Sequence, residues 1–246
     1  MALIEEMQRQ GNWLFRWRGW LPLVLVPFGM IAIADTTRLG EWLDDRDPYW
    51  MAICMGVSYL GFIIRCLIIG YVPNDTSGRN VKEQRAGSVN RVGLYSLVRH
   101  PLYFGNFLVA LGVVLAIKSA WFLLLFLLAY ALYYERIMFA EEAYLRGKFG
   151  TEYEEWAAKT PAFIPALRKM AKPNLTFSWK MVLRREYPAF LLVPLAFLLE
   201  NYFEEHIVEH EPTDHTLAVL FLITALAALC LRTLKKKTRL LQVANR

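Results

Sequence analysis

The stretch SLVRHPLYFGNF, residues 96–107, combines side chains that could bind an anion or a cofactor at the start of an apolar helix. Pro101 suits the first turn of a helix, whose N-terminus carries unpaired N–H groups and a partial positive charge. Arg99 adds a planar guanidinium suited to bidentate binding of a carboxylate or phosphate. Gly105 and Asn106 follow one turn in, where a lipid-facing helix would favour leucine. The stretch therefore predicts either an anion-binding site or an interfacial anchor of Arg, His and Tyr.

A second unusual stretch, residues 135–156, carries acidic side chains at the end of another apolar run. Glu135 and Glu142 lie two turns apart on one face of the predicted helix. Glu135 and Arg136 fall deep enough in the apolar run that their charges are costly unless paired or lining a polar cavity. These charges indicate either a functional site or ion pairs that only hold two helices together.

The elements that position these stretches are six apolar blocks, which we expect to span a bilayer as helices. They run Trp17–Ala34, Tyr49–Val72, Leu102–Ile117, Ala120–Ala140, Tyr187–Phe203 and Thr216–Leu231. Pro188 and Pro194 predict a kink or tilt in the fifth block. Since 56% of the residues are hydrophobic, we expect an all-α, polytopic membrane protein with about six transmembrane helices, which forms a single domain over residues 1–246.

Only Lys118 and Ser119 separate the third and fourth blocks, so these two helices must form a tight hairpin. The start of one and the end of the other are then neighbours in space. Four charged side chains should converge there, at the boundary between membrane and cytoplasm: Arg99, His100, Glu141 and Glu142. Facing positive and negative clusters would suit a zwitterionic ligand, such as the amino-acid end of a cofactor; the alternative is an ion-pair latch for the hairpin.

Lysines and arginines predict the orientation of the chain in the membrane. With a cytoplasmic N-terminus, the outside loops hold only Arg38, Arg46 and Lys118, and most other basic residues lie inside. We therefore expect both termini and the active site in the cytoplasm, with a bacterial inner membrane favoured and the endoplasmic reticulum as the alternative. The net charge of +6 favours anionic membrane lipids over nucleic acid as partners.

No pattern of cysteines or histidines predicts a metal site. The cysteines, Cys54, Cys66 and Cys230, lie inside apolar blocks at unrelated spacings and fit neither a disulfide framework nor a zinc site. The run HIVEH, residues 206–210, matches a zinc-protease pattern. It falls in a short outside loop, however, without a domain to supply a third ligand. We expect no metal cofactor.

The two stretches together resemble the integral-membrane methyltransferases typified by isoprenylcysteine carboxyl methyltransferase and phospholipid methyltransferase. The matching residues are, in order, Gly93-Leu94-Tyr95, Arg99-His100-Pro101-Leu102-Tyr103-Phe104-Gly105, Glu141-Glu142, Leu145, Phe149-Gly150, Tyr153 and Phe163-Ile164-Pro165. The resemblance covers residues 90–167, which would form the methyltransferase core from the third and fourth spans and the next cytoplasmic loop. One departure is Trp156, where many relatives have tyrosine.

The resemblance implies S-adenosylmethionine as the methyl donor, bound at the cytosolic rim of the hairpin. By position, the cofactor-binding residues would be His100, Tyr103, Gly105, Asn106, Glu141 and Glu142. The two glutamates would hold the methionine amino group or the ribose hydroxyls. Arg99 would orient the acceptor or the cofactor carboxylate, and Glu142 would take a proton from an amine acceptor. These two residues are therefore the expected catalytic pair.

The resemblance also implies an acceptor that enters sideways from the bilayer, either a phosphorylated lipid headgroup or a prenylcysteine carboxylate. Arg79, Arg85 and Arg99 would bind it, since arginine suits a phosphate. The run Thr76-Ser77-Gly78-Arg79-Asn80 resembles a bacterial branch associated with methylation of the lipid A 1-phosphate. Ordinary enrichment of basic residues in cytoplasmic loops explains Arg79 and Arg85 equally well.

Two other classes of protein stay open. Sterol- and steroid-type membrane reductases resemble this hairpin, but they use a nicotinamide cofactor such as NADPH. They more often have asparagine after the His-Pro pair, where this chain has Leu102. A non-enzymatic lipid transporter or scaffold would also fit six spans, but no inverted repeat with paired broken helices is visible. None of these patterns predicts an oligomeric state.

Overall fold

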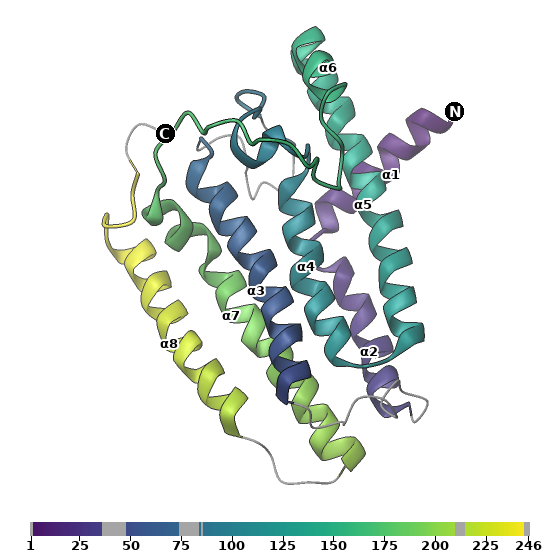
Figure 1. Ribbon diagram of the computed structural model, residues 1–246, viewed down its shortest axis with the longest axis vertical. Coiled ribbons are helices and arrows are strands. Elements are labelled where there is room, and N and C mark those ends of the chain that lie inside the picture. The colour runs from purple at the N-terminus through teal and green to yellow at the C-terminus, as the bar shows by residue number, and fades with distance from the viewer. Residues whose placement is uncertain (1, 36–47, 74–83, 85, 210–214, 244–246) are drawn as a thin grey trace.

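The computed structural model describes residues 2–35, 48–73, 84, 86–209 and 215–243. Within these ranges every regular element is a helix (Figure 1). The α-helices are α1 (Leu3–Trp17), α2 (Leu25–Ala34), α3 (Pro48–Tyr71), α4 (Pro101–Ala116), α5 (Ala120–Phe149), α6 (Thr151–Ala157), α7 (Trp179–Phe203) and α8 (His215–Lys237). The others are η1 (Leu21–Val24), η3 (Gly93–Ser96) and the π-helix η4 (Glu204–Glu209). The predicted all-α class is confirmed for the described part of the chain.

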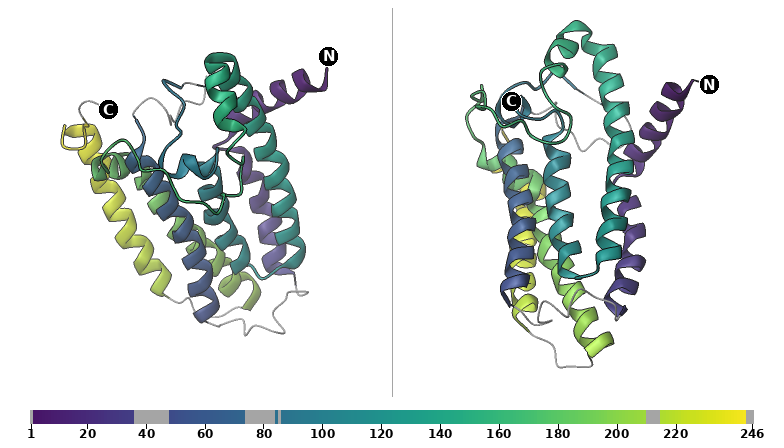
Figure 2. Two further views of the ribbon diagram at one scale, coloured as in Figure 1. Left: turned by 45° about the horizontal axis from the view of Figure 1, so that its top comes forward. Right: turned by 45° about the vertical axis from the view of Figure 1, so that its right-hand side comes forward.

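The longer helices form a bundle with an apolar outer surface. Helices α2, α3, α4, α5, α7 and α8 run alongside one another (Figures 1 and 2). The start of α1, the end of α8 and α6 lie at the same end of the bundle (Figure 1). Leu124, Leu128 and Leu132, one turn apart on α5, are all exposed, as are Leu222 and Leu226 on α8. An apolar surface of this kind suits contact with lipid.

Three of the described helices are long and apolar enough to cross a membrane, namely Tyr49–Tyr71, Ala120–Phe149 and His215–Lys237. Leu3–Trp17 and Leu21–Ala34, bent at 84°, make a fourth span if they are counted together. These helices support an integral membrane protein. Helix α4 has only 16 residues, and α7 carries several charges in its first two turns. Length and composition therefore give three or four spans, where the apolar blocks predicted six.

Helices α3 and α4 pack closely because small residues face each other. A Cβ atom on Gly61 would lie 2.5 Å from the carbonyl oxygen of Gly105, and one on Gly112 would collide with Ser58. The Ser58 hydroxyl donates a hydrogen bond of 2.8 Å to the carbonyl of Val109. In a membrane, close packing and interhelical hydrogen bonds of this kind stabilise a helix pair. This contact fixes the start of α4 relative to α3.

Helices α4 and α5 are joined as a tight hairpin. Helix α4 ends at Ala116 and α5 begins at Ala120. Lys118 adopts a φ of +56° in the turn, a conformation that is uncommon outside glycine. Next to the turn, Phe122 and Phe126 of α5 pack in a buried cluster with residues of α2 and α4. The hairpin returns the chain, so that the start of α4 and the end of α5 lie toward the same end of the bundle (Figure 1).

Helix α7 begins two turns earlier than the predicted fifth span. It starts at Trp179, after Ser178, whose hydroxyl accepts a hydrogen bond from the third residue of the helix. It continues as one helix through Pro188 and Pro194. The sequence block began only at Tyr187 because the preceding turns are polar. The earlier start places Glu186 inside the helix.

The HIVEH run lies in and beyond η4. His206 belongs to this π-helix, whereas His210 lies outside the described residues. Within the described ranges, no three His, Cys, Asp or Glu side chains are grouped so that they could hold a metal ion.

Candidate active site

Side chains at the start of α4 and near the end of α5 form one hydrogen-bonded network. His100 Nε2 lies 2.9 Å from Glu142 Oε1, and its Nδ1 lies 3.5 Å from Glu141 Oε2. Arg99 Nε donates to Glu142 Oε1 over 2.8 Å. The Tyr103 hydroxyl donates to Glu141 Oε2 over 2.9 Å. We call these five residues the rim cluster.

The rim cluster controls the protonation of His100, whose side chain is almost fully buried. Burial alone lowers the pKa of an imidazole, because it disfavours the charged form. The hydrogen bonds and charges of Glu141 and Glu142 outweigh this effect, so the pKa of His100 is raised above its ordinary value. The imidazole therefore keeps its proton, between two carboxylates, to a higher pH than an isolated histidine. Its ring also stacks on Tyr103, with 5.6 Å between centroids.

Arg99 connects the start of α4 to the segment after α6. Its Nη1 donates to the carbonyls of Ala157, over 2.8 Å, and Thr160, over 3.0 Å. Its backbone N–H donates to the carbonyl of Pro161 over 2.8 Å. Together with the bond to Glu142, these contacts give Arg99 a positioning role, since they hold the segment 157–161 against the rim cluster.

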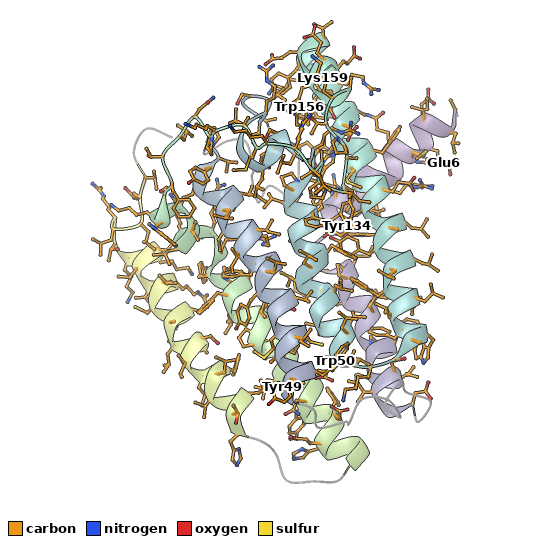
Figure 3. All side chains as sticks on the ribbon, viewed as in Figure 1. Glu6, Tyr49, Trp50, Tyr134, Trp156 and Lys159 are labelled. Atoms are coloured by element: carbon orange, nitrogen blue, oxygen red, sulfur yellow. The ribbon has the colours of Figure 1, made fainter. Side chains whose placement is uncertain are left out.

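A cavity of about 370 Å³ lies beside the rim cluster, within the range of about 300–1,000 Å³ that small-molecule sites occupy. Its wall combines residues of α1, α3, α4, α5, α6 and α7 with the segment before η3. Aromatic side chains contribute much of it, including Tyr95, Tyr103, Tyr134, Tyr144 and Trp156. Tyr134 lies within the bundle and Trp156 toward its end, far from Tyr49 and Trp50 at the opposite end (Figure 3).

A buried ion pair joins α3 to α7 deeper in the bundle. Arg65 donates from Nε and Nη2 to the two carboxylate oxygens of Glu186, each over 2.9 Å. It also donates to the side-chain carbonyl of Asn106, whose amide nitrogen lies 3.4 Å from the Tyr134 hydroxyl. Glu186 is only 3% exposed, so its charge depends on this bidentate pairing. We call these four residues, all of which line the cavity, the floor cluster.

The sequence patterns identified only Asn106 of the floor cluster. Arg65 carried a usable signal, because a charge inside an apolar block indicates a partner or a polar cavity. Glu186 carried none, since it fell outside the predicted fifth span.

Most of the predicted cofactor residues meet at this cavity. Those that line it are His100, Tyr103, Asn106 and Glu141. Glu142 stands beside it and pairs with His100 and Arg99. Gly105 faces α3 instead, where a Cβ atom would lie 2.8 Å from Arg65 Cγ and 3.1 Å from the Gly61 carbonyl oxygen.

The predicted acceptor residues are divided. Arg99 lines the cavity, whereas Arg79 and Arg85 lie outside the described residues. Glu135 and Arg136, whose charges were expected to be paired or to line a cavity, pair with each other over 3.1 Å. Neither of these two lines this cavity.

The cavity residues fit a ligand with the groups of S-adenosylmethionine. Glu141 offers a carboxylate to an ammonium group, and Arg99 offers a guanidinium group to a carboxylate. Trp156 offers an aromatic face, and its indole N–H is buried without a hydrogen-bond partner. A buried donor without a partner is costly unless a ligand or water satisfies it.

Comparison with known proteins places a family match across this site. The sequence pattern of the phospholipid methyltransferase family matches residues 51–152, which include α4, all of α5 and the rim cluster. The protein-S-isoprenylcysteine O-methyltransferase of Schizosaccharomyces pombe is 39% identical over 75 residues, which are 30% of this chain and 32% of that protein. No solved structure matches the chain significantly.

Two bacterial proteins are also similar. The nickel-cobalt-cadmium resistance protein NccN of Alcaligenes xylosoxydans xylosoxydans is 30% identical over 143 residues, 58% of this chain and 62% of that protein. The cobalt-zinc-cadmium resistance protein CzcN of Cupriavidus metallidurans is 41% identical over 75 residues, 30% of this chain and 34% of that protein. The chain thus spans between a third and three fifths of the length of these relatives. The predicted resemblance is confirmed: residues 51–152, which include the rim cluster, match the phospholipid methyltransferase family, and the chain is similar to an isoprenylcysteine O-methyltransferase.

Proposed function

We propose that this chain is an S-adenosylmethionine-dependent methyltransferase of the membrane, acting on a lipid or lipidated acceptor. The observation that carries the proposal is the cavity beside the rim cluster, because its acidic, basic and aromatic residues suit this cofactor. The family match, which includes the rim cluster and part of the cavity wall, supports the reaction class.

The cofactor would supply a methyl group on a positively charged sulfur, so the main task of the protein is positioning and exclusion of water. Glu141, held by Tyr103 and His100, would bind the ammonium group of the ligand. Trp156 would cover its aromatic ring. Arg99 would keep the segment 157–161 closed over the site.

The protonation of the rim cluster bears on the type of acceptor. Glu142 already accepts hydrogen bonds from Arg99 and His100, which reduces its basicity. An acceptor oxygen that is already anionic needs no base, whereas an amine acceptor would have to lose a proton to a carboxylate. This geometry favours O-methylation, and Glu142 then acts by holding His100 and Arg99 in place.

We further propose six membrane spans, with both termini and the rim cluster in the cytoplasm. Helix α4 is roughly 24 Å long at about 1.5 Å per residue, less than a hydrocarbon core of about 30 Å. It packs tightly against α3, however, and its polar start would lie at the interface. Reporter fusions within residues 36–47, 158–178 and 210–214 test this topology: only a fusion within 158–178 should report a cytoplasmic position.

Calorimetry with detergent-purified protein tests the reaction class. S-adenosylhomocysteine, the product form of the cofactor, should bind with micromolar affinity, and NADPH in a parallel titration should not. Binding of NADPH alone would move the protein to the membrane reductases. Binding of neither would favour a lipid transporter or scaffold.

A further inference from the structure

The cavity wall carries more positive than negative charge. Four arginines line it, namely Arg18, Arg65, Arg99 and Arg185, and the glutamates that line it are Glu141 and Glu186. Glu142 pairs with Arg99 and His100 just beside the wall. The net charge of the wall stays positive when this glutamate is counted with it. The cofactor of the proposed function is itself a cation at neutral pH. A second ligand that shares this cavity must therefore bring negative charge.

Two of these arginines lie outside the matched family segment of residues 51–152. Arg18 follows the last residue of α1, and Arg185 lies in α7 next to Glu186. The Arg65–Glu186 pair fixes this part of α7 against α3. Arg185 also lies close enough to Tyr95, on the cavity wall, to oppose the effect of burial, which raises the pKa of that phenol. Helices α1 and α7 thus add a basic face to the cavity.

The surroundings place this basic face at the depth of lipid headgroups. Trp17 and Trp20 flank Arg18 at the bend between α1 and α2, and both are exposed, by 46% and 71%. Trp179 at the start of α7 is 69% exposed. Exposed tryptophans at helix ends mark the boundary between hydrocarbon and water, where headgroups lie.

We propose that Arg18 and Arg185 form the acceptor subsite of the cavity and bind the anionic oxygen headgroup of a membrane lipid. This inference rests on the proposed function and names its substrate class. A lone pair on the headgroup oxygen forms the new O–CH₃ bond, while the S–CH₃ bond breaks and its electron pair stays on sulfur. No proton is released, so the subsite needs cations rather than a base. Arg65 positions α7 through Glu186 rather than binding the headgroup itself.

The test is a binding titration of short-chain lipids to purified protein that is saturated with S-adenosylhomocysteine. The probes are dihexanoyl phosphatidic acid as a phosphate monoester, N-acetyl-S-farnesylcysteine as a carboxylate, and dihexanoyl phosphatidylethanolamine as an amine. We expect one of the first two to bind, and the phosphate to bind tighter because it carries nearly two negative charges. Arg18→Gln and Arg185→Gln should each weaken that binding about tenfold or more.

Matched control variants separate this subsite from general surface charge. Arg184→Gln and Arg16→Gln remove neighbouring exposed arginines that do not line the cavity, and both should keep the affinity of the parent protein. S-adenosylhomocysteine should bind all four variants within about threefold of the parent, and their melting temperatures should agree.

The outcomes separate the inference from the proposed function. If the parent protein fails to bind S-adenosylhomocysteine, the proposed function itself fails. If it binds, but the amine lipid is the preferred probe, the inference is wrong. The inference is equally wrong if Arg18→Gln and Arg185→Gln bind the anionic lipids as tightly as Arg16→Gln and Arg184→Gln.

Discussion

The rim cluster and the floor cluster both remove charges from water, but they are constructed differently. The rim cluster joins adjacent helices of one hairpin, and it keeps Glu141 one third exposed. Its histidine lies between two carboxylates, with one ring nitrogen toward each of them. The floor cluster joins α3 to α7, and its carboxylate is 3% exposed and bound through both oxygens.

This difference indicates two roles. The partly exposed carboxylate of the rim cluster can exchange a protein contact for a ligand contact at small cost. The floor cluster cannot, because either partner left alone would be a buried charge. We infer that the rim cluster serves the ligand and that the floor cluster holds the bundle together around it.

The largest effect is expected at the floor cluster. Glu186→Leu should destabilise the protein by about 3 kcal/mol, because it leaves Arg65 as an uncompensated buried charge. Thermal unfolding in detergent measures the loss, and Arg65→Met in the same chain should restore most of it. Glu135→Leu, at an exposed glutamate of α5, serves as the control. An unchanged melting temperature for Glu186→Leu would contradict the structural role of the pair.

The rim cluster should respond through ligand binding instead. Glu142→Gln removes the charge that holds Arg99 and protonated His100, so the affinity for S-adenosylhomocysteine should fall about a hundredfold. His100→Ala should abolish binding, and both proteins should stay folded. Calorimetry provides the affinities, with Glu154→Gln on the exposed face of α6 as the control. Parent-like affinity in both rim variants would rule out this cavity as the cofactor site.

Gly105→Ala tests whether Gly105, which lies between the two clusters, serves helix packing or cofactor binding. A Cβ atom there approaches Arg65 Cγ and the Gly61 carbonyl, so we expect a loss of about 1–2 kcal/mol from overpacking. Gly147→Ala, where no atom lies within 4 Å of the added carbon, should be neutral or slightly stabilising. If Gly105→Ala instead weakened cofactor binding at unchanged stability, this glycine would belong to the cofactor site, as the family resemblance implied.

The smallest effect is a dependence of stability on pH. The pKa of His100 is raised in the folded state, so its protonated form stabilises the fold. This contribution is complete below the unfolded pKa of about 6.5 and is lost as the pH rises through the higher folded value. The difference in unfolding free energy between the parent and His100→Gln should therefore shrink from pH 6 to pH 9. A difference that grows with pH would mean that Glu141, Glu142, Arg99 and Tyr103 do not hold a protonated imidazole.

The sequence was informative where contacts are local. Only Lys118 and Ser119 separate two apolar runs, so the hairpin and the meeting of Arg99 and His100 with Glu141 and Glu142 follow from chain geometry alone. The family motifs support the same prediction, because they lie on the two helices of this hairpin.

The floor cluster was not predictable because it pairs helices far apart in the chain. No local pattern states which face of α7 meets Arg65. The hydrophobic pattern also did not include the first two turns of α7, since these helical turns carry Lys180, Arg184 and Arg185. Gly105 was assigned to the cofactor by resemblance, and only the packing of α4 on α3 shows its contact with Gly61.

The most direct test of the central claim is transfer of a labelled methyl group. Membranes that contain the protein are incubated with S-adenosylmethionine labelled on its methyl group, and the lipid fraction is then counted. The parent protein should label a lipid species, and Glu141→Gln, in an equally stable protein, should not. Labelling at equal rates by both proteins would contradict the assignment of the rim cluster to a methyltransferase active site. The assignment would also be contradicted if neither protein labelled a lipid and neither bound S-adenosylhomocysteine.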